Sequence, residues 1–267
     1  MKTIRNKYDK SLIQNLPRVL FEGRIVVVIS GREADAAIDY LMTQPILGFD
    51  TETKPSFKKG KSYQVALLQV STHDICFLFR LNHIGITDSI KRLLEDSTIT
   101  KVGLSIQDDI RALSKKREFK AGTFIELQKE VTRLGVQDMS LQKLYANIFG
   151  EKIAKNQQLS NWEADSLSEA QQRYAATDAW ACIKLYEEIC RLDANNDYQL
   201  EIVPEPEPAA DADADADQSA PKDEDSTKKK RRRPSSAARR NAAARRAKKD
   251  LPTTKSVEEA IESIIKS

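Results

Sequence analysis

The stretch ILGFDTET (residues 46–53) decides the fold of this chain. Its apolar start is typical of a central strand. Side chains two residues apart on a strand point to the same face, so Asp50 and Glu52 should project together from the end of the strand. Two carboxylates at the edge of a core repel each other and need a cation. A solvated strand edge is the alternative interpretation of this pair, but the apolar residues before it favour a metal site.

Two further acidic segments lie far along the chain. Asp109 belongs to VGLSIQDDIRAL (102–113), where a helix is expected to begin, and Asp178 belongs to QRYAATDAW (172–180). Helix starts favour acids, so capping is the alternative role for Asp109, unless Asp108 caps the helix and leaves Asp109 for chemistry. Tyr174 precedes Asp178 by four residues and shares its helix face, although core packing of Tyr174 is the alternative.

These four carboxylates suit a pair of divalent metal ions if the fold brings them together. Two ions about 3.5–4 Å apart can stabilise the attacking and the leaving oxygen of a phosphodiester displacement. The phenol of Tyr174, with an ordinary pKa near 10, is better suited to orienting a water than to deprotonating it. The hypothesis is therefore that the protein cuts nucleic acid.

The composition excludes several other chemistries. The 267 residues contain only two histidines, and the sequence has no Cys/His zinc pattern, no GxSxG elbow and no Gly-rich phosphate loop. Three cysteines without a disulfide framework indicate reduced thiols and a reducing compartment. The N-terminus has no apolar signal region, and no stretch approaches the roughly 20 apolar residues of a membrane span, so a soluble, cytoplasmic protein is expected.

Strand patterns dominate the first half of the chain and helix patterns the second, with strand–helix alternation between them. This order predicts an α/β fold with a mixed sheet flanked by helices. The predicted strands cover residues 24–30, 46–51, 62–71, 74–79, 100–104 and, more weakly, 123–128. The predicted helices cover residues 32–43, 86–95, 108–116, 127–134, 140–149 and 168–192. The strands over 62–71 and 74–79 should form a hairpin. A capping box at Ser168–Gln171 should start the last helix, and Ser140 and Gly150 should cap and end the helix over 140–149.

The composition changes at Pro204, so we expect a folded domain over residues 1–203 and a low-complexity tail over 204–267. Residues 204–225 hold nine acidic residues and one Lys, whereas residues 226–249 hold twelve Lys and Arg residues and no acid. Such charge blocks predict disorder. An apolar stripe at helical spacing marks 256–266 as a short amphipathic segment that suggests a partner.

Taken together, the ordered motifs Asp50-Thr-Glu52, Asp109 and Tyr174-x₃-Asp178 resemble the DEDD superfamily of 3′-5′ exonucleases, in its tyrosine branch. The ribonuclease D-like group and the Werner exonuclease domain are the most similar members. Supporting segments are QVALLQVST, TFIELQ, SLQKL and KNQQLSNW, and the resemblance covers about residues 20–192. The branch with a histidine near the third motif is excluded, because no His follows His83.

The resemblance implies a ribonuclease H-like fold with a five-stranded mixed sheet and two Mg²⁺ or Mn²⁺ ions. It implies that Asp50 bridges both ions, that Glu52 and Asp178 complete one site, and that Asp109 holds the second ion. Tyr174 would orient the attacking water, and nucleoside 5′-monophosphates would leave from a 3′ end. The helical domains that follow the exonuclease in ribonuclease D have no counterpart of sufficient length here.

Several residues near the motifs are candidates for binding the nucleic acid. The lysine-rich loop after the first motif could meet phosphates and stack an aromatic ring on the terminal base, although a solvated loop is the alternative. The candidate substrate-binding residues are Thr51, Phe57, Lys58, Lys61, Asn161 and Trp162. For Asn161 and Trp162 a structural role is the alternative, and Trp is more often a core residue. The basic tail, within residues 226–267, could add affinity for nucleic acid or for a protein partner.

Two other functions stay open on the sequence. One is a catalytically retired ribonuclease H-like adaptor that binds nucleic acid, and the other is an exoribonuclease that matures RNA. The intact acidic set favours an enzyme over the adaptor, because a retired site would have no need for four uncompensated carboxylates.

Overall fold

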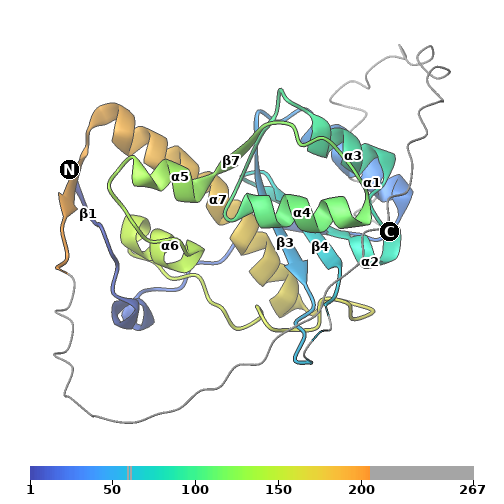
Figure 1. The fold of residues 1–267 in the computed structure, drawn as a ribbon, viewed down its shortest axis with the longest axis horizontal. Helices are drawn as coiled ribbons and strands as arrows, with labels where there is room; N and C mark the ends of the chain where they lie inside the picture. Colours follow the sequence, from blue (N-terminus) through green and yellow to red (C-terminus); the bar gives the residue numbers. More distant parts are fainter. Residues whose placement is uncertain (59, 61, 205–267) are drawn as a thin grey trace, which may run out of the picture. The chain divides into compact units, whose positions relative to one another are not determined.

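A computed structural model describes residues 1–58, 60 and 62–204. Its centre is a mixed six-stranded sheet in the order β2-β5-β4-β3-β6-β7 (Figure 1). The strand β4 is antiparallel to both of its neighbours, and the other pairs are parallel. The strands are β2 (Arg24–Val28), β3 (Ile46–Thr53), β4 (Val65–Ser71), β5 (Ile75–Arg80), β6 (Thr100–Gly103) and β7 (Phe124–Glu126).

The predicted α/β class with a mixed sheet is confirmed. The five-stranded sheet that the family resemblance implied is wrong. Strand β7, which the sequence predicted weakly over 123–128, pairs with β6 and extends the sheet at that edge, with Lys101 opposite Phe124. The two sequence segments that should form a hairpin do so, since β4 and β5 pair antiparallel across residues 72–74.

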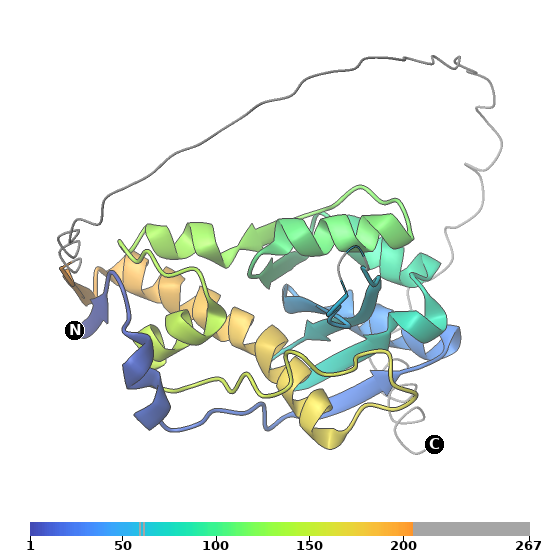
Figure 2. The same ribbon diagram turned by 60° about the horizontal axis from the view of Figure 1, so that its bottom comes forward.

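Helices cover both faces of the sheet (Figures 1 and 2). One face packs against α1, α3 and α4 in a core that contains Phe49 and Leu113. The other face packs against α5, α6 and the long α7, which crosses the sheet diagonally. The helices are α1 (Gly31–Leu41), α2 (Leu81–Ile84), α3 (Asp88–Glu95), α4 (Ile106–Lys116), α5 (Leu127–Thr132), α6 (Leu141–Phe149) and α7 (Glu169–Asn195).

Local sequence signals set most helix ends. Ser168 and Gln171 form the predicted capping box at the start of α7. Ser140 caps α6, which ends at Gly150 in the left-handed conformation, as expected. The predicted helix over 86–95 begins later, because Gly85 at φ 65° ends α2 and leaves a new start at α3.

One close contact brings α7 onto the sheet. A Cβ on Gly48 in β3 would lie 1.9 Å from the carbonyl oxygen of Ala179 in α7, so only glycine fits there. Ala175, Ala176 and Ala179 keep the facing side of α7 small and are fully buried. This contact sets the middle of α7 directly against the end of β3, where the acidic residues lie.

The chain ends of the described domain form a second, small sheet that the sequence did not predict. Strand β1 (Lys2–Arg5) pairs in parallel with β8 (Tyr198–Glu201) and is followed by the 3₁₀ helix η1 (Lys10–Asn15). The tail predictions for residues 205–267 lie outside the described residues. Within residues 1–204, apart from positions 59 and 61, no helix has the length and apolar character to cross a bilayer.

Candidate active site

Three of the four predicted metal ligands meet where α7 crosses the end of β3. Asp50 and Glu52 project from the same face of β3, and Asp178 reaches them from α7. One carboxylate oxygen from each of these residues lies within 4.8 Å of the other two. The strand therefore places two carboxylates together, as predicted, and the Gly48–Ala179 contact adds the third.

Asp109 reaches the site through a different contact. It lies in the first turn of α4, and the hydroxyl of Thr51 donates a 2.5 Å hydrogen bond to its Oδ1. Because Thr51 lies between Asp50 and Glu52, this bond ties Asp109 to the acidic strand. The predicted alternative that Asp109 only caps a helix is wrong, since its carboxylate accepts from a side chain of β3.

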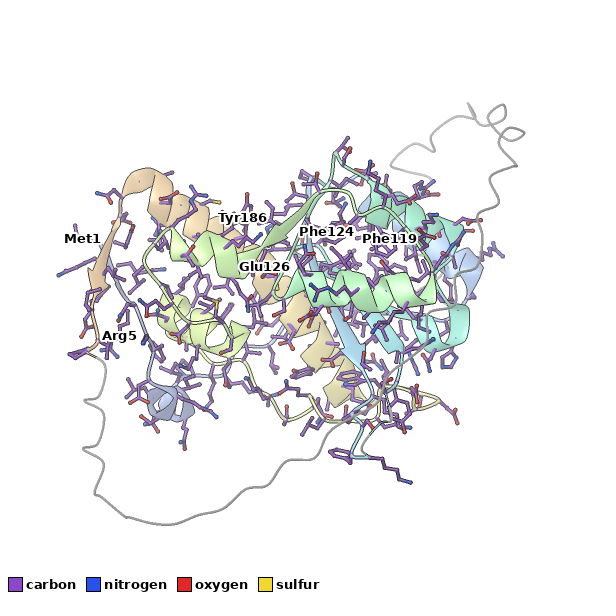
Figure 3. All side chains as sticks on the ribbon, viewed as in Figure 1. Met1, Arg5, Phe119, Phe124, Glu126 and Tyr186 are labelled. Carbon is purple, nitrogen blue, oxygen red and sulfur yellow. The ribbon has the colours of Figure 1, made fainter. Side chains whose placement is uncertain are left out.

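The cap of α4 comes from a distant residue instead. Glu126 at the end of β7 accepts hydrogen bonds from the backbone N–H groups of Ser105 (3.0 Å) and Ile106 (2.8 Å). Figure 3 labels Glu126 beside the start of α4. The suggestion that Asp108 caps this helix is therefore wrong; Asp108 is exposed and pairs with Arg111 at 2.7 Å.

The four carboxylates strongly perturb one another. Burial, and then the charge of Asp178, raises the pKa of Asp50 to about 8. Burial and the neighbouring charges raise the pKa of Glu52 to about 10, and burial with the charge of Asp50 raises the pKa of Asp109 to about 8. These raised pKa values reflect the free-energy cost of bringing several negative charges together in a buried site.

Asp178 differs from the other three because a cation, Lys155, is among the groups that offset its burial. Burial raises its pKa to about 7, but the hydroxyl of Tyr174 and the charge of Lys155 oppose that rise. Clustered carboxylate oxygens are the donors that hard divalent cations such as Mg²⁺ and Mn²⁺ prefer. The donor set therefore fits divalent metal, and a bound cation would relieve the mutual repulsion of these groups.

Tyr174 lies at the edge of this cluster with its ring in the core. Its ring packs against Trp162 at a centroid distance of 6.1 Å, and burial raises the pKa of its phenol well above the usual range. The phenol therefore stays protonated at neutral pH and donates towards Asp178. Core packing and a place in the site, which the sequence offered as alternatives, are both present.

Trp162 lies in the core, which is one of the two roles that the sequence left open for it. Its side chain is 0% exposed, so the predicted contact with nucleic acid is not available in this structure. The loop that carries Trp162 is held by the buried Arg80, whose guanidinium donates to the carbonyl oxygens of Ala164 and Asp165. Trp162 thus packs against the ring of Tyr174 and supports its position.

A pocket of about 300 Å³ opens directly over the carboxylates. Besides the acidic residues and Tyr174, its wall includes Lys155, Gln158 and Gln142. These three were not predicted as site residues, although Lys155 and Gln158 belong to the segment KNQQLSNW. Lys155 could have been found from the sequence, because it is the only charged residue of this segment, which already matched the family pattern.

The remaining candidate residues divide between the site and a neighbouring pocket. Thr51 lines the site, but its hydroxyl is bound to Asp109, so the contact present is with the protein rather than with substrate. Phe57, Lys58 and Asn161 line a second pocket of about 330 Å³. Phe57 is 83% exposed there, which leaves its ring free to stack. Lys61 lies outside the described residues.

The sequence of this chain is similar to those of known proteins. A family model described as 3′-5′ exonuclease matches residues 25–192, well over half of the chain. The mouse bifunctional 3′-5′ exonuclease/ATP-dependent helicase WRN is 29% identical over 195 residues, which is 69% of this chain and 14% of that protein. A 3′-5′ exonuclease from Arabidopsis thaliana is 32% identical over 194 residues, covering 65% of this chain and 66% of that protein.

Solved structures show the same fold. The exonuclease domain of Aedes aegypti Nibbler superposes with a TM-score of 0.60 at 22% identity, over 66% of this chain and 92% of that one. Ribonuclease D of Escherichia coli gives a TM-score of 0.57 at 19% identity, over 64% of this chain and 45% of that one. The matched part of this chain therefore spans 14% of the length of the mouse protein and 66% of the length of the Arabidopsis protein.

Proposed function

Because the chain belongs to the 3′-5′ exonuclease family, we propose that it hydrolyses the terminal phosphodiester bond at a nucleic-acid 3′ end and releases a nucleoside 5′-monophosphate. The observation that carries this proposal is the meeting of Asp50, Glu52 and Asp178 within 4.8 Å, with Asp109 joined through Thr51. Three of the four acidic groups of the family pattern therefore line one pocket, and the fourth, Asp109, is hydrogen-bonded to Thr51 in its wall.

The four carboxylates would hold two divalent cations. Asp50, Glu52 and Asp178 would form one site, and Asp50 with Asp109 would form the second. Cations bound there would stabilise the charge on the attacking and leaving oxygens of the displacement. The donor chemistry supports Mg²⁺ or Mn²⁺ in preference to softer metals.

The other residues of the pocket would position the reactants. The protonated phenol of Tyr174 lies beside Asp178, where it would orient a water for attack on the terminal phosphate. The ammonium of Lys155, at the pocket wall, would offset the charge of the phosphate. The exposed ring of Phe57 would stack on a base in the neighbouring pocket, with Lys58 near the backbone.

Blocking one end of the substrate tests the direction of cleavage. With Mn²⁺ present, oligonucleotides labelled at the 5′ end should shorten from a free 3′-hydroxyl end and resist hydrolysis when the 3′ end is blocked. The product should be a nucleoside 5′-monophosphate on chromatography. Internal cuts in the blocked substrate, or cleavage that survives a chelator, would overturn the proposal.

The sugar of the substrate is a separate question, because relatives differ in what they act on. Matched ribo- and deoxyribo-oligonucleotides, run side by side at equal concentration, would separate an exoribonuclease that matures RNA from a deoxyribonuclease. An adaptor without catalytic activity would bind both and cleave neither. The intact acidic set supports catalysis over that alternative.

The basic charge of the tail, which lies outside the described residues, would raise the affinity for nucleic acid. Deletion of residues 226–249 removes twelve Lys and Arg residues and should weaken binding and flatten its salt dependence. Hydrolysis of a minimal substrate should not change. Equal affinity and equal salt slope with and without these residues would contradict this role. The cytoplasmic location expected from the sequence stays a prediction.

A further inference from the structure

The catalytic pocket and a second hollow beside the N-terminal segment share a lining residue, and we call the two hollows together the groove. Gln142, in the first turn of α6, lines both the catalytic pocket and a second hollow of about 310 Å³. That hollow is closed on its far side by η1 and contains Lys10 and Lys152. The two hollows therefore share a wall at Gln142, where its amide also donates to the carbonyl oxygen of Ile153 at 2.8 Å.

From this continuity we propose that the groove binds the nucleic-acid strand on the 5′ side of the scissile bond. The proposal rests on the exonuclease function above, because a bound 3′ end obliges the rest of the strand to leave the pocket along the surface. Pockets for ligands begin at about 300 Å³, so a hollow of this size has room for a nucleotide-sized group next to the terminal one.

The positive charge of the residues around the second hollow supports a phosphate backbone as its ligand. Lys10 is exposed and forms no ion pair with any residue of the described part of the chain. Lys152 lies across the hollow, and its ammonium donates only to the carbonyl oxygen of Gln14. No carboxylate lines this hollow among the described residues. Lysines placed in this way meet phosphates and carry no sequence preference.

The groove joins a segment that precedes the family match to the domain that the family match covers. Lys10 lies before residue 25, where the family match begins, whereas Gln142 and Lys152 lie within it. The 3₁₀ helix is anchored by backbone bonds between Pro17 and Lys152 (2.8 Å) and by the Asp9 cap at Ser11 (2.8 Å). The N-terminal segment thus contributes a fixed surface beside the catalytic pocket.

Binding of oligonucleotides of two lengths tests the groove. The full chain carrying Asp50→Asn, which prevents hydrolysis, is titrated with single strands of three and twelve nucleotides while fluorescence anisotropy is followed. Lys10→Glu should weaken binding of the longer strand roughly tenfold and lower its salt slope by about one, while the shorter strand changes less than about twofold. Lys152→Glu should act in the same direction.

The control is Lys120→Glu, an exposed lysine in the loop between α4 and β7, which should leave both affinities unchanged. Thermal unfolding of each variant checks the fold. If Lys152→Glu unfolds, Lys10→Glu still tests the proposal, because the side chain of Lys10 forms no hydrogen bond or ion pair with the described residues. Equal affinity of Lys10→Glu and Lys120→Glu for the longer strand would overturn the proposal, as would an equal loss for both lengths.

Hydrolysis of the p-nitrophenyl ester of thymidine 5′-monophosphate separates this proposal from the exonuclease function. The ester occupies only the catalytic pocket, so Lys10→Glu in the otherwise wild-type chain should hydrolyse it at the wild-type rate. A wild-type chain that cleaves neither the ester nor any oligonucleotide would defeat the exonuclease function, whereas the anisotropy measurement would still decide the groove.

Discussion

The two sides of the active site hold their carboxylates by different means. On the β3–α7 side, Asp50, Glu52 and Asp178 are fixed by a buried strand and a helix that touch at Gly48. On the α4 side, Asp109 is held by a single hydroxyl, and the start of its helix is fixed by Glu126. The first side depends on core packing, and the second depends on a few polar contacts.

This difference suggests that one side of the site sets the affinity for metal and the other side adjusts the activity. Three crowded carboxylates create the strongest demand for a cation, so the β3–α7 side should dominate metal binding. Asp109 is held by a hydrogen bond from a side chain and not by packing of its own side chain in the core, so the α4 side should tune activity more than stability. Variants that affect one side and spare the other test this contrast.

The largest effect is expected from Asp50→Asn on the β3–α7 side. The amide keeps the shape of the side chain but removes a charge from the centre of the cluster. Hydrolysis of an oligonucleotide should fall by at least about a thousandfold. Initial rates with saturating Mn²⁺ measure this loss, and a variant that retains more than a tenth of the wild-type rate would refute the central role of Asp50.

Tyr174→Phe removes only the hydroxyl beside Asp178 and keeps the ring against Trp162. The water would lose its positioning group, and kcat should fall by about 100-fold. Affinity for Mn²⁺ should stay within about twofold, because the carboxylates are unchanged. Comparison of kcat with the Mn²⁺ half-saturation concentration checks both; a loss confined to metal affinity would contradict the proposed role of the phenol.

Thr51→Val sharpens the contrast from the α4 side. Without the hydroxyl, Asp109 loses its hydrogen bond, and activity should fall by about tenfold, as for other groups that orient a metal ligand. Asp108→Asn is the matched control, because this neighbouring acid is exposed and pairs only with Arg111. Steady-state rates of both variants decide the matter, and equal losses would place Asp108 in the site as well.

The smallest effect concerns stability and its dependence on pH. Folding raises the pKa of Asp50 and Asp109 from the ordinary 3.8 to about 8, because burial disfavours their charged forms. The protonated forms therefore stabilise the metal-free fold below about pH 4, and this stability is lost as the pH rises to about 8. The melting temperature without metal should fall by on the order of 5 °C over this range.

Differential scanning calorimetry in the presence of a chelator measures that fall. Asp50→Asn should show a smaller fall than the wild-type chain, because one of the ionising groups is gone. Added Mn²⁺ should raise the melting temperature more at pH 8 than at pH 5. A metal-free protein whose stability rises between these pH values would contradict the electrostatic account of the cluster.

The sequence predicted the β3–α7 side better than the α4 side. The period of two in ILGFDTET and the capping box at Ser168 are local signals, and both hold in the structure. The helix containing Asp109 begins at Ile106 instead of Asp108, because Glu126 caps it from about 20 residues away. Local propensity carries no information about such a distant partner.

The same reason explains the other misses. Strands β1 and β8 pair across almost the whole domain, and each has only four residues, too few for a periodic pattern. For Trp162 the sequence left a core role and a substrate role open, and its packing against Tyr174 places it in the core. In each case a long-range contact decides the outcome.

Titration of Mn²⁺ into the metal-free protein at pH 8 tests the central claim most directly. Isothermal calorimetry of the wild-type chain should show two bound ions per chain, and Asp50→Asn should lose both, because Asp50 would contribute to both proposed sites. Loss of one ion in Asp109→Asn would assign the second site to the α4 side. Unchanged Mn²⁺ binding in Asp50→Asn would contradict the claim that these carboxylates gather around metal.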